Sequence, residues 1–321
     1  MTSVSVVVPT RNRSRLLATT LRSVLWQRDV ELEVVVVEDA STDDTAEMVT
    51  GLADPRVTLV RRDAPRGPST ARNEGAERAR GEWLAFCDDD DVWAPDKVAV
   101  QVAAAEEGGR DWAYVGSVNV GGALEVVSGG PPPEPEEVVA ALPRYNAVPG
   151  GGSNVILRRP LLEHLGGFDE RLPPCEDWEL WIRLAREAPP AFVRRPLMGY
   201  RLHGGSSSLD TERILRSARL IEQTHATRVD RGRLHRWLAE SALRMNRRGE
   251  ALSHMAKAAV RGQAAGVASD LLAILRRRVA RVPWAGDRMP PGADDAWAAE
   301  ASAWLEELRA RTAGADESGL R

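Results

Sequence analysis

The chain has 321 residues, 43% of them hydrophobic and 28% charged, which is enough for one large domain or two ordinary ones. Its formal charge of -4 gives no general attraction to nucleic acid, and no apolar segment is long enough to span a membrane. Its two cysteines, Cys87 and Cys175, belong to no CxxC motif or Cys/His cluster, which argues against disulfides and zinc. The short apolar run at the N-terminus is unlike a signal peptide, so we expect a cytoplasmic protein.

Short β-branched runs alternate with helix-like stretches in the first part of the chain. Strands buried on both faces are predicted at Ser3–Pro9, Leu32–Glu38, Val57–Arg61 and Trp83–Cys87. Crossover helices that open with capping residues are predicted at Ser14–Gln27, Asp43–Leu52 and Ser69–Ala79. This alternation predicts an α/β fold with a parallel sheet and right-handed crossovers.

Polar clusters follow three of these strands, as PTRNR (9–13), EDASTDDT (38–45) and CDDDD (87–91). Ligands of α/β sheets bind beyond the carboxyl ends of the strands, so we expect the three clusters to form one site. Four adjacent aspartates raise one another's pKa unless a cation, backbone N–H groups or water absorbs the charge. The residues alone leave two interpretations open, a metal site and a solvated loop before a helix that begins near Pro95.

The rest of the chain is less regular. Gly- and Pro-rich composition predicts loops at 126–137 and 148–154. Helices are predicted from Asp210 onward, including a pair within 236–262 that is broken near Gly249. The tail beyond Pro283 ends in a charged helix that we expect to be an appendage, with its last residues a candidate for disorder.

No GxxxxGK[ST] loop or GxGxxG motif occurs, which excludes P-loop enzymes and dinucleotide dehydrogenases. A receiver domain would place an acid directly after the first strand, where Pro9 and Thr10 stand. The combined motifs resemble the inverting family 2 glycosyltransferases of the GT-A fold. The matching segments follow the family's order over about two thirds of the chain: VVVPTRNR (6–13), VVVEDASTDDT (35–45), GPSTARNEGAERARGEWLAFCDDDDVWAPDK (67–97), GGFDERLPPCEDWELWIRL (167–184) and YRLHGGSSS (200–208).

The resemblance implies a GT-A domain at 1–209, with a Rossmann-like nucleotide-binding half at 1–110 and an acceptor half at 111–209. Residues 210–321 would form a helical extension. The implied reaction moves a sugar from a nucleoside diphosphate sugar, first of all a UDP-sugar, to a hydroxyl of a glycan, a lipid-linked acceptor or a small molecule. A divalent cation would help the diphosphate to leave, and Mg²⁺ or Mn²⁺ suits carboxylate ligands.

The family's DxD motif falls on Asp88, Asp89 and Asp90. By this resemblance Asp90 binds the metal directly, and Asp88 faces the ribose or binds the metal through water. Asp91 either completes the motif or caps the following turn.

The resemblance also implies donor-binding residues. Asp39 would accept a hydrogen bond from the base, although it and Ser41 could instead cap the following helix. The other implied contacts are Pro9, Thr10 and Arg13 at the nucleoside, Arg72 and Asn73 near the base and diphosphate, and Arg201 and His203 over the donor phosphates. For Arg72 the alternative is a salt bridge on a helix surface.

The segment PPCEDWELWIRL (173–184) predicts a loop that enters a helix with one apolar stripe. The resemblance assigns the catalytic base to Asp177, with Glu176 as its rival. Acids also stabilise a helix start, so a structural role is open for both residues.

Two other function classes stay open. A sugar-phosphate nucleotidyltransferase shares the α/β layout but would have a Gly-rich loop after the first strand, and a catalytically inactive scaffold could use the C-terminal helices to bind a partner. The basic run 275–284 could lie on the inner face of an anionic membrane, although packing against the catalytic domain is the favoured alternative.

Overall fold

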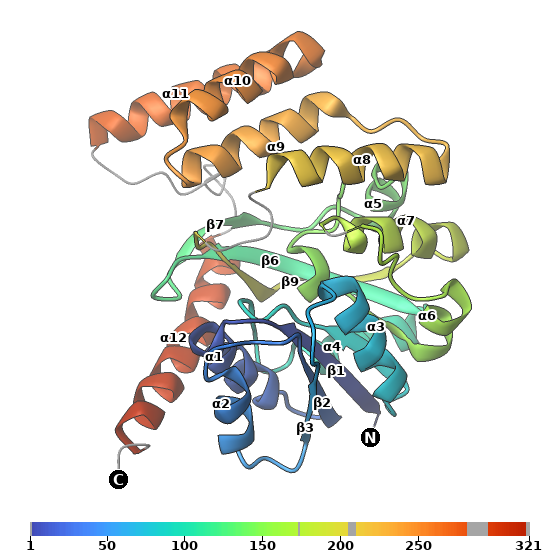
Figure 1. Cartoon of the computed structure of the whole chain (residues 1–321). Coiled ribbons are helices and arrows are strands. Elements are labelled where there is room, and N and C mark those ends of the chain that lie inside the picture. The colour runs from blue at the N-terminus through green and yellow to red at the C-terminus, as the bar shows by residue number, and fades with distance from the viewer. Residues whose placement is uncertain (1, 173, 205–209, 281–294, 319–321) are drawn as a thin grey trace.

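The computed structural model describes residues 2–172, 174–204, 210–280 and 295–318 (Figure 1). The strands are β1 (Ser3–Thr10), β2 (Glu31–Glu38), β3 (Val57–Arg61), β4 (Trp83–Phe86), β5 (Val92–Trp93), β6 (Trp112–Val120), β7 (Val126–Gly130), β8 (Ile156–Arg158) and β9 (Ala191–Arg201). The helices are α1 (Ser14–Leu25), α2 (Thr45–Gly51), α3 (Pro68–Arg78), α4 (Lys97–Glu107), α5 (Pro135–Ala141), α6 (Arg159–Leu165), α7 (Glu176–Glu187), α8 (Thr211–His225), α9 (Arg231–Arg244), α10 (Arg248–Ala258), α11 (Ala264–Ala280) and α12 (Asp295–Ser318), with short turns η1 (Gly151–Ser153) and η3 (Ala259–Gln263).

The strands form one mixed sheet in the order β3-β2-β1-β4-β8-β6-β9-β5, and β7 pairs with β6. β1 is parallel to both β2 and β4, and β2 is parallel to β3, which confirms the predicted parallel portion. β8 runs antiparallel to β4 and β6. The carboxyl ends of β1, β2 and β4 therefore meet at one edge, as the three polar clusters require.

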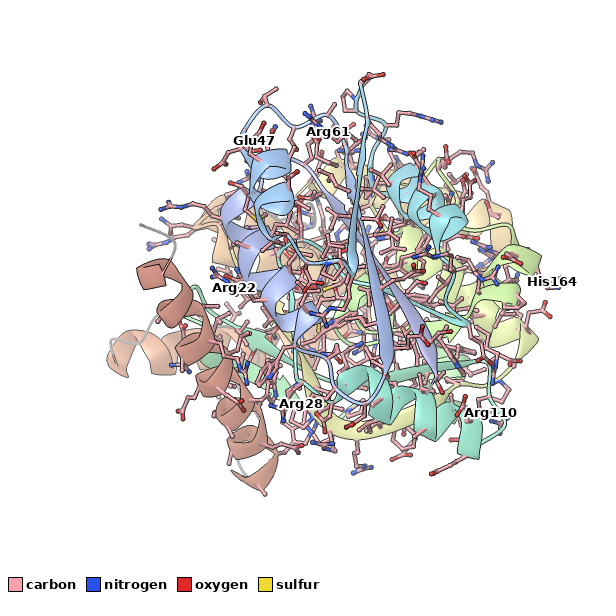
Figure 2. All side chains as sticks on the ribbon, turned by 90° about the horizontal axis from the view of Figure 1, so that it is seen from below. Arg22, Arg28, Glu47, Arg61, Arg110 and His164 are labelled. Carbon is pink, nitrogen blue, oxygen red and sulfur yellow. The ribbon has the colours of Figure 1, made fainter. Side chains whose placement is uncertain are left out.

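Helices cover both faces of the sheet. Successive side chains of a strand point to opposite faces, so Val6 and Val8 pack with α1, α4 and α12, while Val7 packs with α3 and α7. α8 and α9 extend the second layer, and α10 and α11 lie beyond α9 in Figure 1. Figure 2 shows labelled charged residues such as Arg110 and His164 at the periphery, and His164 is exposed.

The last helix, α12, belongs to the core. Its Trp297 and Trp304 are buried in the same apolar cluster as the strands, and their ring nitrogens donate to Arg194 O and Pro196 O of β9, each at 2.8 Å. Glycines leave room for these rings, because a Cβ at Gly116 would lie 3.1 Å from Trp297 and one at Gly199 3.3 Å from Trp304. The expectation of an appendage is wrong.

Two predicted loops contain regular structure. Val126–Gly130 pairs as β7 with β6 alone, and such a marginal strand tolerates glycine better than a central one. α5 begins at Pro135, since proline suits the first turn of a helix, and η1 lies within the 148–154 loop. The break in the C-terminal helix pair falls between Arg244 and Arg248, slightly before the predicted Gly249.

Within the described residues, no helix has both the length and the apolar character needed to cross a bilayer. The run 275–284 considered for membrane contact belongs to α11 up to Ala280, and its side chains lie outside the described part of the chain. Its role stays a prediction.

Trp304→Ala should lower the free energy of unfolding by about 3 to 5 kcal/mol, because it removes a large buried ring and leaves a cavity against β9. Urea denaturation followed by circular dichroism measures the change. Trp237→Ala is the matched control, since that ring is 37% exposed and its loss should cost much less. Equal losses in the two variants would contradict the placement of α12 in the core.

Candidate active site

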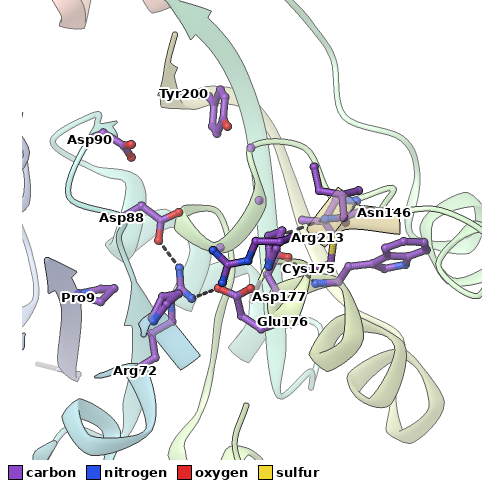
Figure 3. Close-up of a pocket in the computed structure, with 18 of the residues that line it drawn as sticks. Pro9, Arg72, Asp88, Asp90, Asn146, Cys175, Glu176, Asp177, Tyr200 and Arg213 are labelled. Carbon is purple, nitrogen blue, oxygen red and sulfur yellow. Dashed lines mark hydrogen bonds and ion pairs between the residues drawn. The ribbon is translucent and has the colours of Figure 1, made fainter. Parts of the chain in front are cut away.

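A pocket of about 1050 Å³ opens beyond the carboxyl ends of β1, β2 and β4 (Figure 3). Thr10 Oγ1 donates to Asp89 Oδ2 at 2.8 Å, and Thr42 N donates to Asn12 Oδ1 at 2.7 Å, so the three polar clusters do meet. The sequence-predicted residues that line the pocket are Pro9, Thr10, Arg13, Asp39, Arg72, Asp88, Asp89, Asp90, Glu176 and Asp177. Arg201 and His203 stand behind this lining, against the aspartates.

Positive charge from distant segments reaches the aspartate run. Arg13 Nη1 donates to Asp89 Oδ1 at 2.8 Å and to Asp90 Oδ2 at 2.7 Å. His203 Nε2 lies 2.7 Å from the same Asp90 oxygen. Side chains that follow β1 and β9 therefore both bond to this loop.

Asp91 is fully buried and holds the loop in place. Its Oδ2 accepts from Ser153 Oγ at 2.6 Å and its Oδ1 from Arg201 N at 3.0 Å, while Ser153 Oγ also accepts from Asp88 N at 2.9 Å. Asp91 thus ties the loop to η1 and β9 instead of capping the following turn. The sequence did not single out Ser153, because GGGSN indicated only a loop.

Burial and neighbouring charges shift the pKa values of Asp89, Asp90 and Asp91 in different directions. Burial, opposed by Arg13 and reinforced by Asp90, raises the pKa of Asp89 to about 6. Burial would also raise the pKa of Asp90, but the hydrogen bond from His203 and the charge of Arg13 outweigh it and lower that pKa. Burial and the charges of Asp90 and Asp88 raise the pKa of Asp91 well above its usual value. Asp90 is therefore favoured as a carboxylate at neutral pH.

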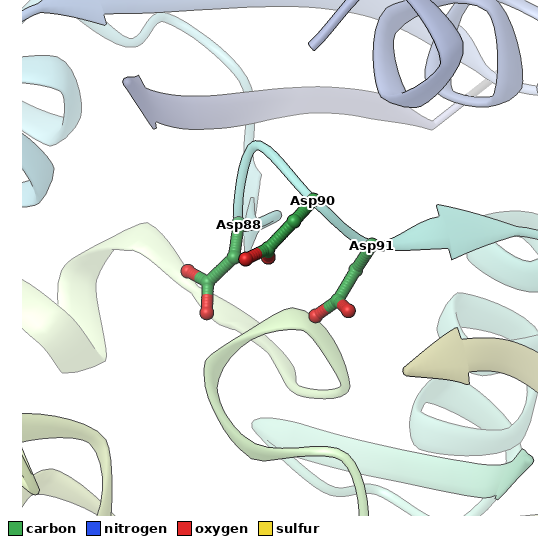
Figure 4. A group of neighbouring side chains, drawn as sticks. All are labelled: Asp88, Asp90 and Asp91. Atoms are coloured by element: carbon green, nitrogen blue, oxygen red, sulfur yellow. The ribbon is translucent and has the colours of Figure 1, made fainter. Parts of the chain in front are cut away.

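The donor set of this loop fits a hard divalent cation. Asp88, Asp90 and Asp91 each offer a carboxylate oxygen, and these atoms lie within 4.8 Å of one another (Figure 4). Carboxylate oxygens are the ligands that Mg²⁺ and Mn²⁺ prefer. The Asp88 side chain is more accessible than that of Asp91, at 31% exposed. Both carboxylate oxygens of Asp91 already accept hydrogen bonds.

Asp39 does not cap a helix. Its carboxylate accepts from Arg66 N at 2.9 Å, from Gly67 N at 2.8 Å and from Arg62 Nη1 at 3.0 Å. Asp43 instead accepts from Thr45 N, and Ser41 Oγ accepts from Asn12 N, so the capping alternative for Asp39 and Ser41 is wrong. Asp39 lines the pocket and fixes the turn that starts α3.

Arg72 is a buried bridge, not part of a surface salt bridge. Its Nη2 donates to Asp88 Oδ1 and its Nη1 to Glu176 Oε1, each at 2.5 Å, so it joins the aspartate loop to the start of α7 (Figure 3). Asn73 points elsewhere, because both of its polar atoms bond to the backbone of Phe168. Asn73 therefore does not line the pocket.

Asp177 faces the pocket from the first turn of α7. Asn146 Nδ2 lies 3.4 Å from its Oδ2, and a Cβ at Gly151 would lie 3.2 Å from that oxygen, so the glycine keeps space open there. The preceding Cys175 has a left-handed backbone, with φ of 83°, which is uncommon for a residue with a side chain. Burial, and then the charge of Glu176, raises the pKa of Asp177 to about 7.

Arg201 carries unsatisfied donors. Its Nε and Nη2 are buried without a hydrogen-bond partner among the described residues. Burial lowers its pKa despite the opposing charges of Asp91 and Asp90. Buried guanidinium N–H groups are costly to leave unpaired, so these donors favour a further acceptor.

Two family models match the chain. The one described as Glycosyl transferase family 2 matches residues 5–166, about half of the chain, and the one described as Glycosyltransferase like family 2 matches residues 139–216. The succinoglycan biosynthesis protein ExoO of Rhizobium meliloti (strain 1021) is 32% identical over 231 residues, which are 66% of this chain and 63% of ExoO. The chain thus spans less than two thirds of that relative.

A second relative is the UDP-Glc:alpha-D-GlcNAc-diphosphoundecaprenol beta-1,3-glucosyltransferase WfaP of Escherichia coli, 24% identical over 69% of this chain and 86% of WfaP. Among solved structures, S. aureus TarS in complex with UDP-GlcNAc has a TM-score of 0.58 at 22% identity and covers 76% of this chain and 72% of its own. The mannosyltransferase PcManGT from Pyrobaculum calidifontis, in complex with GDP-Man and Mn²⁺, has a TM-score of 0.53 at 21% identity over 96% of this chain and 85% of its own. With the order of motifs and the sheet described above, these matches show that the fold is GT-A and that the chain belongs to glycosyl transferase family 2.

Proposed function

We propose that the chain moves a sugar, with inversion, from a nucleoside diphosphate sugar to an acceptor hydroxyl. The observation that carries this proposal is that the aspartate loop and Asp177 face one pocket from different segments, with Arg72 between them. The names of the similar structures, which contain UDP-GlcNAc or GDP-Man, support a donor of this class. A UDP-sugar is the first donor to test.

The donor end of the pocket holds the nucleotide in this proposal. Pro9, Thr10 and Arg13 line the nucleoside pocket, and Asp39 accepts a hydrogen bond from the base. The unpaired N–H groups of Arg201 suit the oxygens of a diphosphate, since a guanidinium forms strong, directional bonds to phosphate. His203 lies beside Asp90 behind the lining of this end, with its Nε2 2.7 Å from Asp90 Oδ2.

Asp90 and Asp88 would hold the cation, either Mg²⁺ or Mn²⁺. When bound, a divalent cation stabilises the negative charge that develops on the departing diphosphate. The charge of Arg13 and the hydrogen bond with His203 favour the ionised form of Asp90 and orient it. Asp91 and Ser153 fix the position of the loop from behind.

Asp177 acts as the base. As the acceptor oxygen forms its bond to the anomeric carbon, the bond from that carbon to the diphosphate breaks and the hydroxyl proton passes to Asp177. Glu176 is a poorer candidate, because its carboxylate already accepts a hydrogen bond from Arg72 Nη1 at 2.5 Å, whereas Asn146 Nδ2 approaches Asp177 Oδ2 only to 3.4 Å. A pKa near 7 suits a base at neutral pH.

Asp90→Asn should abolish turnover and weaken nucleotide binding that depends on metal, because it removes the ionised ligand. The test is calorimetry of UDP binding with and without Mn²⁺, together with a hydrolysis assay on UDP-, GDP- and dTDP-sugars. Asp63→Asn, at an exposed aspartate outside the pocket, serves as the control and should behave like the unmodified chain. Full activity in the presence of a chelator would count against the metal site.

Asp177→Asn should keep donor binding but lower transfer by about 10²-fold or more, the range expected for loss of a positioned base. Steady-state rates with a fixed donor and acceptor measure the loss, and Glu176→Gln should cost less. If Asp177→Asn retained near-normal transfer while Glu176→Gln lost it, the base would be Glu176. Activity in both variants would reject the inverting mechanism.

The rate of transfer should rise with pH through about 7, because only the ionised form of Asp177 accepts a proton. Glu176→Gln removes the neighbouring negative charge that helps to raise this pKa, so its profile should move to lower pH. Rates measured from about pH 5.5 to 8.5 test both points. A profile that does not move in Glu176→Gln would show that the two carboxyl groups are not coupled in the working enzyme.

A further inference from the structure

The pocket continues past Asp177 beneath α8 and α9. This outer half is lined by Tyr145, which follows α5, by Arg213 of α8, and by Arg233 and Trp237 of α9. Figure 3 shows Arg213 directed into the pocket on the side of Glu176 and Asp177. The second family match includes Tyr145 and Arg213 but ends at residue 216, so Arg233 and Trp237 of α9 lie outside both family matches.

Aromatic rings form one part of the wall. The Arg233 guanidinium lies 4.2 Å from the centre of the Tyr145 ring, and this stacking holds both side chains at the pocket. Trp237 follows Arg233 by one helical turn and is 37% exposed, whereas the other tryptophans in the described part of the chain are buried. Exposed rings in a pocket provide apolar surface with a polar edge, which suits the faces of a sugar.

Two arginine side chains form the other part of the wall. No hydrogen bond or ion pair joins the Arg213 guanidinium to any residue in the described ranges, and its backbone N–H alone bonds to Asp210. The Arg233 side chain is 53% exposed, and its closest carboxylate, that of Asp230, is 3.9 Å away. By contrast, Asp270 binds the neighbouring Arg236 at 2.7 and 2.8 Å.

We propose that this half of the pocket binds an acceptor that carries a phosphate or diphosphate group beside the sugar that it presents to Asp177. Arg213 and Arg233 hold the anion, because a guanidinium pairs well with phosphate oxygens, and Tyr145 and Trp237 cover the sugar ring. This inference rests on the proposed function, since it takes Asp177 as the point where donor and acceptor meet. The name of WfaP, which includes a diphosphate-linked GlcNAc, describes an acceptor of this chemistry in a relative.

The test compares two probes on the full chain with saturating UDP and Mn²⁺. One is GlcNAc joined through a diphosphate to a short alkyl chain, and the other is GlcNAc joined directly to the same chain. Calorimetry should show the charged probe binding about tenfold or more tightly, as expected for charge-assisted hydrogen bonds, with the preference falling as salt increases. A third probe, GlcNAc 1-phosphate, distinguishes a free sugar phosphate from a lipid-linked acceptor.

Arg213→Gln and Arg233→Gln should each reduce the preference for the charged probe while leaving UDP affinity unchanged. Arg216→Gln is the matched control on α8, because its guanidinium pairs with Glu212 and lies outside the pocket. Melting temperatures identify any variant that fails to fold, and the probe comparison on the unmodified chain stands without the variants.

Equal binding of the charged and neutral probes, or no binding of the charged probe, would overturn this inference. A preference that survives in both arginine variants would also overturn it. UDP affinity is measured on the same samples, so failure of the proposed function appears separately, as the absence of UDP binding.

Discussion

Four consecutive aspartates after a buried strand repel one another, and here side chains from elsewhere in the chain offset much of that repulsion. Arg13, Arg72 and His203 supply hydrogen bonds to this run, and Arg201 adds charge from the end of β9. The pairing of β1 with β4, and of β6 with β9, brings these segments together. The architecture of the sheet is therefore also the means by which the acidic loop is neutralised.

The parallel half of the fold could be read from sequence because its signals are local. Runs such as VSVVV predict buried strands, and polar residues mark where the intervening helices begin. The predicted capping is wrong, because the N-cap residues of α1, α2 and α3 make no side-chain hydrogen bond to the helix. The position of α12 could not be read in this way. Trp297 and Trp304 lie in a charged helix after a Pro-rich stretch, and their partners Gly116 and Gly199 are far away in sequence. Nothing local distinguishes such a helix from an exposed one.

The candidate site likewise has some features that the sequence predicts and others that only the structure reveals. Acids at strand ends follow from composition and position, so Asp39 and Asp88 to Asp91 were predicted as pocket residues. The pairings of these acids were not predicted. Ser153 is 62 residues from Asp91, and His203, which the resemblance had implied only at the donor phosphates, is 113 residues from Asp90. Arg213 and Arg233 were missed because polar residues on amphipathic helices look alike until the pocket shows which of them face inward. Spacing along the chain carries no information about such contacts.

The packing of α12 on β9 has a consequence for synthesis on the ribosome. Residues 191–201 emerge long before residues 295–318, so the apolar groove beside Gly116 and Gly199 stays uncovered while about a hundred further residues are made. β9 also carries the backbone N–H that holds Asp91 and ends just before His203. The nascent chain must therefore keep an exposed sheet face from aggregating until α12 has been made.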